Sequence, residues 1–122
     1  MLVVDDDEAM ARMIRLTLLS EGYVVSTASD GFEGLKKLEE GGFSLVVLDL
    51  QMPNMDGRAF FREFRSRGGT TPILLLSAYG ALNARQELGA EAAVAKPFDP
   101  AVLVRTVRAL LPEDAVCEPG DG

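Results

Sequence analysis

The chain has 122 residues, about the size of one domain, and its 48% hydrophobic and 25% charged residues are typical of a globular protein rather than a disordered one. Its 19 acidic and 12 basic residues give a net charge of −7, which argues against a general nucleic-acid-binding protein. No apolar run is long enough to cross a bilayer, no signal segment is expected, and the single Cys117 excludes an internal disulfide, so we expect a cytoplasmic protein.

The chain contains no histidine. This excludes Ser-His-Asp and Cys-His catalysis, zinc sites with histidine ligands, and a role as a phosphohistidine donor. Any chemistry must therefore use carboxylates, a hydroxyl group, a lysine, backbone groups or a bound metal ion.

The first half of the chain predicts three strands with two helices between them. The strands are apolar or β-rich runs at residues 2–4, 23–27 and 43–48. The helices have apolar residues at helical spacing and cover residues 8–21 and 30–40. A glycine follows each of these helices, which is typical of a helix end.

The second half predicts two further strands and three further helices. A turn at residues 52–57 leads into a helix that ends at a pair of glycines, 68–69. The strands are expected at residues 72–76 and 92–95, and the last two helices at residues 83–88 and 100–111. Strands that are apolar on both faces and alternate with helices indicate an α/β protein, whose parallel sheet is covered on both sides.

Four of the five predicted strands end in a charged or hydroxyl-bearing residue. These residues are Asp5 and Asp6, Asp49, Ser77, and Lys96. In a parallel sheet the carboxyl ends of the strands lie at one edge, where ligands bind. We therefore expect these side chains to converge on one site.

The expected site combines carboxylates with a hydroxyl group and an ammonium group. Neighbouring carboxylates repel one another, and a divalent cation that prefers oxygen ligands, Mg²⁺ or Mn²⁺, would remove this repulsion. A lysine and a serine can stabilise a phosphoryl group, and a carboxylate can act as its nucleophile. The residues therefore predict magnesium-assisted phosphoryl transfer to an aspartate, but they do not identify which aspartate.

Five short motifs together resemble the receiver domain of two-component response regulators. They are Val3-Val4-Asp5-Asp6-Asp7, Val47-Leu48-Asp49, Met52-Pro53-Asn54-Met55-Asp56-Gly57, Leu76-Ser77-Ala78 and Ala95-Lys96-Pro97-Phe98. The resemblance covers residues 1–111 and leaves residues 112–122 as an acidic tail or linker. It implies a flavodoxin-like, doubly wound (βα)5 fold with a five-stranded parallel sheet of order 2-1-3-4-5.

The resemblance also implies roles for the polar residues at the sheet edge. Asp49 would be the phosphoacceptor, and Ser77 would be the switch hydroxyl that moves to a phosphoryl oxygen. Lys96 would contact the phosphoryl group, and its peptide bond to Pro97 would be cis.

The same resemblance implies a metal site and two tuning residues. Asp5, Asp6 and Asp49, with the backbone carbonyl of Gln51, would hold Mg²⁺, with Mn²⁺ as the alternative. The side chains of Gln51 and Tyr79 would flank the phosphoryl group and tune how fast it is lost.

Two features depart from the family pattern. Ala93 stands where many receivers carry a tyrosine or phenylalanine, and the stretch between Ser77 and Lys96 is shorter than usual by about one helical turn. We therefore expect the signal to leave through the loop at residues 77–80 and the helix that follows it.

The resemblance implies a phosphorylation switch that modifies only itself and is not an enzyme with a separate substrate. A sensor histidine kinase or a histidine phosphotransfer protein would donate the phosphoryl group to Asp49. A downstream output domain or target protein would respond to the phosphorylated form. A second copy of this chain, in a homodimer, is a further possible partner. No direct contact with nucleic acid or membrane is expected.

Two alternatives stay open at this point. The first is a receiver-like binding module that works without phosphorylation, which Ala93 favours. The second is a phosphatase with an aspartate nucleophile. Such enzymes typically need an acid two residues after the nucleophile, and Gln51 at that position counts against this alternative.

Overall fold

The computed structural model describes residues 1–51, 57–78 and 81–111. Most of the expected turn at residues 52–57, the expected tuning residue Tyr79 and the expected tail at residues 112–122 lie outside the described residues. In the described part, no helix is both long enough and apolar enough to cross a membrane.

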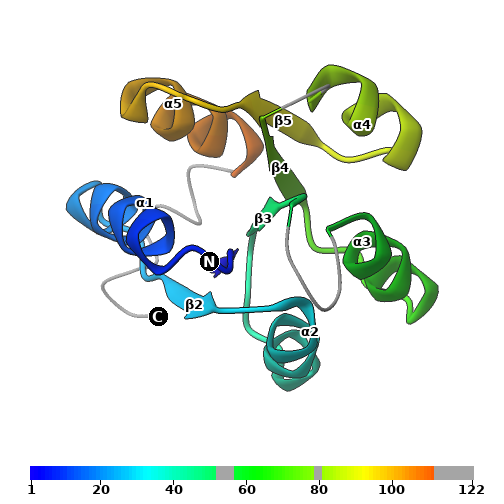
Figure 1. The fold of residues 1–122 in the computed structure, drawn as a ribbon. Helices are drawn as coiled ribbons and strands as arrows, with labels where there is room; N and C mark the ends of the chain where they lie inside the picture. The colour runs from blue at the N-terminus through cyan, green and yellow to red at the C-terminus, as the bar shows by residue number, and fades with distance from the viewer. Residues whose placement is uncertain (52–56, 79–80, 112–122) are drawn as a thin grey trace.

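Strands and helices alternate along the chain, as predicted (Figure 1). The strands are β1 (Leu2–Val4), β2 (Ser26–Ala28), β3 (Val46–Asp49), β4 (Ile73–Ser77) and β5 (Ala92–Ala95). The helices are α1 (Glu8–Ser20), α2 (Gly31–Glu40), α3 (Gly57–Ser66), α4 (Ala81–Leu88) and α5 (Pro100–Leu110). All strand pairs are parallel and the sheet order is β2-β1-β3-β4-β5, which confirms the predicted fold class.

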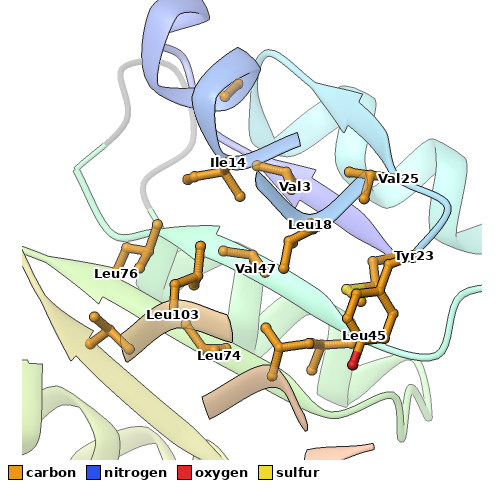
Figure 2. Packing of buried hydrophobic residues seen from close by; sticks show 14 of the residues in the cluster. Val3, Ile14, Leu18, Tyr23, Val25, Leu45, Val47, Leu74, Leu76 and Leu103 are labelled. Carbon is orange, nitrogen blue, oxygen red and sulfur yellow. The ribbon is translucent and has the colours of Figure 1, made fainter. Parts of the chain in front are cut away.

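The helices cover both faces of the sheet, with α1 and α5 on one face and α2, α3 and α4 on the other (Figure 1). Two hydrophobic clusters result. One includes Val3, Ile14, Leu18, Val47, Leu74, Leu76 and Leu103 (Figure 2). The other includes Val4, Leu35, Leu48, Phe60, Leu75 and Ala84. Successive strand residues point to opposite faces, so continuous apolar strands are required to fill both clusters.

Strand β2 is shorter than predicted. It begins at Ser26, although the β-rich run begins at Tyr23. The reason is its partner: β2 pairs only with β1, and the ladder runs from Leu2 with Ser26 to Val4 with Ala28. Tyr23 is buried instead as part of the cluster beneath α1 and α5.

Aspartate side chains cap the first turn of three helices, α1, α2 and α5, with Asp30 as the cap of α2. Asp7 accepts hydrogen bonds from the N–H groups of Ala9 and Met10, and Asp99 accepts one from Ala101 N–H. Such caps satisfy backbone donors that have no partner in the first helical turn. The cap at Asp7 starts α1 directly after the acidic pair at the end of β1.

Candidate functional site

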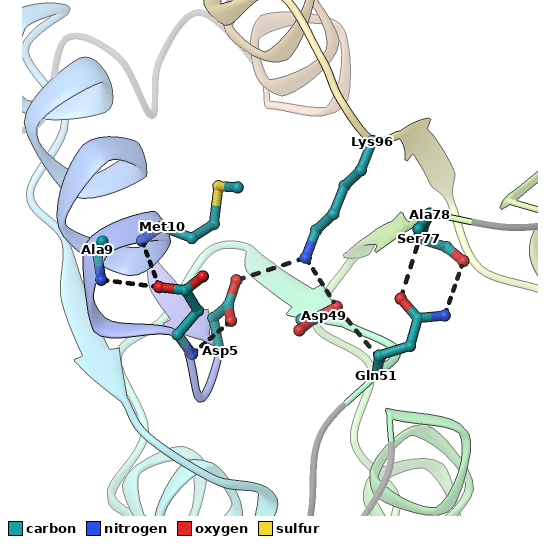
Figure 3. A network of polar contacts seen from close by, with 9 residues as sticks. Asp5, Ala9, Met10, Asp49, Gln51, Ser77, Ala78 and Lys96 are labelled. Carbon is teal, nitrogen blue, oxygen red and sulfur yellow. Dashed lines mark hydrogen bonds and ion pairs between the residues drawn. The ribbon is translucent and has the colours of Figure 1, made fainter.

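The polar residues predicted to converge lie at the carboxyl edge of the sheet (Figure 3). Asp5 and Asp6 directly follow β1, Asp49 ends β3, Ser77 ends β4, and Lys96 directly follows β5. Asp5, Asp49 and Ser77 are buried, whereas Asp6 is exposed. Because β1, β3, β4 and β5 are neighbours in the sheet, residues far apart in the sequence meet here.

Asp49 lies at the centre of this group and is only 3% exposed. Its Oδ1 atom accepts a hydrogen bond from Lys96 Nζ at 3.1 Å and another from the N–H of Gln51 at 3.2 Å. The side chain of Lys96 therefore faces the carboxylate and neutralises part of its charge. The peptide bond between Lys96 and Pro97 is cis, as predicted.

Asp5 has one satisfied and one unsatisfied carboxylate oxygen. Oδ1 accepts a hydrogen bond from the N–H of Asp7 at 2.9 Å. Oδ2 is buried without a hydrogen-bond partner among the described residues, and Lys96 Nζ is 3.9 Å away from it. Burial, together with the negative charge of Asp49, raises the pKa of Asp5 to about 6, although the Asp7 N–H and Lys96 act against this rise. A buried carboxylate oxygen without a hydrogen-bond partner is suited to bind a metal cation.

The carboxylates fit a divalent cation. One oxygen from each of Asp5, Asp6 and Asp49 lies within 4.8 Å of the other two. All three donors are oxygens, which suits Mg²⁺ or Mn²⁺ rather than a metal that prefers nitrogen or sulfur ligands. Bound there, a cation would supply the partner that Asp5 Oδ2 lacks.

Gly57, which the sequence indicates only as part of a turn, helps to position Asp49. The N–H of Gly57, the first residue of α3, donates to the carbonyl of Leu50 at 3.1 Å. A Cβ atom at Gly57 would lie 2.5 Å from Leu50 Cα and 2.7 Å from the carbonyl oxygen of Asp49. Only glycine allows α3 to approach the end of β3 so closely. Its place within the motif at residues 52–57 was the one available signal.

We expect the affinity of the protein for Mg²⁺ to fall about tenfold between about pH 7.5 and about pH 5. With a pKa of about 6, Asp5 is ionised at the higher pH and mostly protonated at the lower, so protons compete with the metal. Calorimetric titration with MgCl₂ alone measures the effect. Asp5→Asn should bind Mg²⁺ weakly at both pH values. Equal affinity of the parent protein at the two pH values would contradict this role of Asp5.

Comparison with known proteins establishes the family. The chain matches the response regulator receiver domain family over residues 1–108. The chain belongs to this family. Receiver domains of two-component systems bind Mg²⁺ at an acidic cluster, and the group formed by Asp5, Asp6 and Asp49 is a cluster of this kind. Receiver domains are generally not enzymes with a separate substrate.

Individual relatives agree with this assignment. The receiver domain is 38% identical to the uncharacterized transcriptional regulatory protein YkoG of Bacillus subtilis (strain 168) over 113 aligned residues. The aligned region covers 90% of this chain and 50% of YkoG. It spans about half or less of the length of such curated relatives.

Solved structures of receiver domains share the fold. The chemotaxis protein CheY4 of Vibrio cholerae superposes with a TM-score of 0.83 at 34% identity, covering 90% of this chain and 96% of that one. The response regulator TrrA of Thermotoga maritima, solved in complex with Mg²⁺ and BeF, gives a TM-score of 0.81, with the same identity and coverage.

Proposed function

We propose that this receiver domain accepts a phosphoryl group on Asp49 and uses it to switch its conformation. The observation that carries the proposal is the setting of Asp49. Its buried carboxylate lies 3.1 Å from Lys96 Nζ and beside the carboxylates of Asp5 and Asp6. A nucleophilic carboxylate, a cation and an acidic metal site are the parts that phosphoryl transfer requires.

The transfer would proceed by in-line displacement. A carboxylate oxygen of Asp49 attacks the phosphorus atom, the bond from phosphorus to the nitrogen of a donor histidine breaks, and the imidazole leaves and takes up a proton. Mg²⁺ held by Asp5, Asp6 and Asp49, with the backbone carbonyl of Gln51 as a further ligand, would neutralise charge on the phosphoryl oxygens. Water later cleaves the acyl phosphate and restores the carboxylate. Autophosphorylation and autodephosphorylation at this residue are the only reactions proposed.

Two side chains would bind the phosphoryl oxygens once they are attached. Lys96 already faces Asp49 and would donate to one of them. Ser77 ends the strand beside β3 and would donate from its hydroxyl group. These new contacts favour one of two arrangements of the β4–α4 region, so phosphorylation shifts a population rather than creating a new fold. The role of Tyr79 in tuning the loss of the phosphoryl group is part of the same proposal.

The proposed phosphoryl transfer requires a donor of the group and a downstream partner that responds to it. This chain has no histidine of its own to carry the phosphoryl group, and we propose that a sensor histidine kinase or a histidine phosphotransfer protein donates it in the cytoplasm. We propose an output domain or a target protein as the downstream partner, and residues 1–111 as the receiver domain that controls it. A second copy of this chain is a further candidate partner. The −7 net charge supports protein partners over direct binding to nucleic acid.

Incubation with acetyl phosphate tests the proposal without a kinase. With Mg²⁺ present, we expect the intact mass of the chain to rise by one phosphoryl group, because Asp49 needs only a reactive phosphoryl compound and a cation. With EDTA present, we expect no gain. A chain that gains nothing in Mg²⁺ or in Mn²⁺ would contradict the proposed function and favour a binding module that works without phosphorylation.

A further inference from the structure

The side chain of Gln51 links the ends of two neighbouring strands (Figure 3). Its Nε2 atom donates to Ser77 Oγ at 3.3 Å, and its Oε1 atom accepts from the N–H of Ala78 at 3.4 Å. Ser77 is the last residue of β4 and Ala78 follows it, whereas Gln51 follows β3. The carboxamide therefore fastens the start of the β4–α4 connection to the segment that carries Asp49.

The chemistry of the two partners requires a carboxamide. A backbone N–H can only donate, so Oε1 must face Ala78, and Nε2 is then left to donate to the hydroxyl oxygen of Ser77. Methionine has a similar length but neither group, and asparagine is one methylene shorter. The backbone of Gln51 is itself held in place, because its N–H donates to Asp49 Oδ1 at 3.2 Å.

The bonds from Gln51 act on a group that the phosphorylated form needs. Under the proposed function, on which this inference rests, Ser77 donates its hydroxyl hydrogen to the phosphoryl group on Asp49. In the unphosphorylated protein, the carboxamide fixes the position of the same Oγ atom. Both bonds are longer than the usual N–H···O distance of about 2.9–3.0 Å. They are therefore weak enough to break when Asp49 is phosphorylated.

We propose that Gln51 is a latch, a positioning residue that stabilises Ser77 and Ala78 in their unphosphorylated arrangement and must release them when Asp49 is phosphorylated. Ala93, which stands on β5 beside the β4 strand, has only a methyl group and cannot hold Ser77 by a hydrogen bond. The carboxamide of Gln51 thus supplies a restraint on the β4–α4 connection that the side chain of Ala93 does not.

The latch is tested by the affinity for fluoroberyllate, a mimic of the phosphoryl group, with Mg²⁺ present. Gln51→Met keeps the bulk of the side chain and removes both hydrogen bonds. We expect it to bind fluoroberyllate about threefold to tenfold more tightly than the parent chain, because the unphosphorylated arrangement loses two weak hydrogen bonds. In a chain that already carries Ser77→Ala, Gln51→Met should raise the affinity for fluoroberyllate by less than half as much, since one hydrogen-bond partner of Gln51 is already gone.

Nuclear magnetic resonance gives a readout that does not depend on phosphorylation. In the metal-free chain, Gln51→Met should move the Ala78 amide proton resonance upfield, as expected for a lost hydrogen bond. The Asp7 amide, whose hydrogen bond goes to Asp5, serves as the control and should stay in place. An unmoved Ala78 resonance would overturn the latch.

The outcomes separate the latch from the proposed function. If the parent chain binds fluoroberyllate and Gln51→Met binds it equally or more weakly, the latch is wrong and the proposed function stands. If neither chain binds it at any Mg²⁺ concentration, the proposed function is overturned and the latch with it.

Discussion

The substitution Asp49→Asn is expected to abolish the Mg²⁺-dependent gain of a phosphoryl group from acetyl phosphate. The side chain stays the same size, and its amide oxygen can still accept from Lys96 and from the N–H of Gln51. The fold should therefore persist, but the proposed nucleophile and one of the three carboxylates of the acidic cluster are lost. Intact mass spectrometry after incubation measures the result.

The matched control is the same chemical change at Asp7→Asn. Asp7 caps α1, is exposed, and lies next to the acidic pair. Asparagine caps helices about as well as aspartate, so we expect this variant to gain the phosphoryl group like the parent chain. A full, metal-dependent gain in Asp49→Asn would show that another residue is the acceptor. Loss of the gain in Asp7→Asn as well would point to a general effect of charge near the metal.

The substitution Phe60→Ala is expected to reduce the free energy of unfolding by about 3–5 kcal/mol. Phe60 is fully buried in the cluster between the sheet and α2, α3 and α4, and its ring stacks on Phe64 with centroids 6.5 Å apart. The ring also touches the backbone of α2, since a Cβ atom at Gly34 would lie 2.9 Å from Phe60 Cε2. Helix backbone on one side and sheet on the other cannot collapse into the cavity that the substitution leaves.

Phe32→Ala is the control for this loss of stability, because Phe32 is the same residue type but is 59% exposed. We expect it to change the free energy of unfolding by less than about 0.5 kcal/mol. Urea denaturation of both variants and the parent chain provides the comparison. A Phe60→Ala variant that unfolds at the same urea concentration as Phe32→Ala would mean that this cluster contributes little to the fold.

The sequence predicted the parts of the fold that local patterns determine. Alternation of apolar runs with amphipathic helices established the α/β class, and polar residues at strand ends located the edge where Asp5, Asp49 and Lys96 meet. The order of the strands came only from the family resemblance, because pairing between distant segments leaves no mark on either segment alone. The late start of β2, at Ser26 rather than Tyr23, could not be predicted for the same reason, since pairing with β1 sets it.

Contacts between side chains that lie far apart in the sequence could not be predicted from it. Helical spacing of Arg58, Arg62 and Arg65 on α3 indicates a solvated face, and the side chains of Arg58 and Arg62 are indeed open to solvent. The spacing gives no sign that both of them pair with Glu87 on α4. Arg65 pairs with Glu91 at 2.9 Å, with its guanidinium 4.9 Å from the centre of the Phe61 ring. The link from Gln51 to Ser77 is of the same kind, because a glutamine in a loop carries no sign of what it binds.

The position of the phosphoryl group on the phosphorylated chain tests the central claim most directly. Borohydride reduces an aspartyl phosphate to homoserine, and mass spectrometry of the peptides then locates the reduced residue. We predict homoserine in place of Asp49 alone, in chain treated with acetyl phosphate and Mg²⁺ and not in chain treated with EDTA. Homoserine in place of Asp5 or Asp6, or a phosphorylated chain with no reduced residue, would contradict the assignment of Asp49 as the phosphoacceptor.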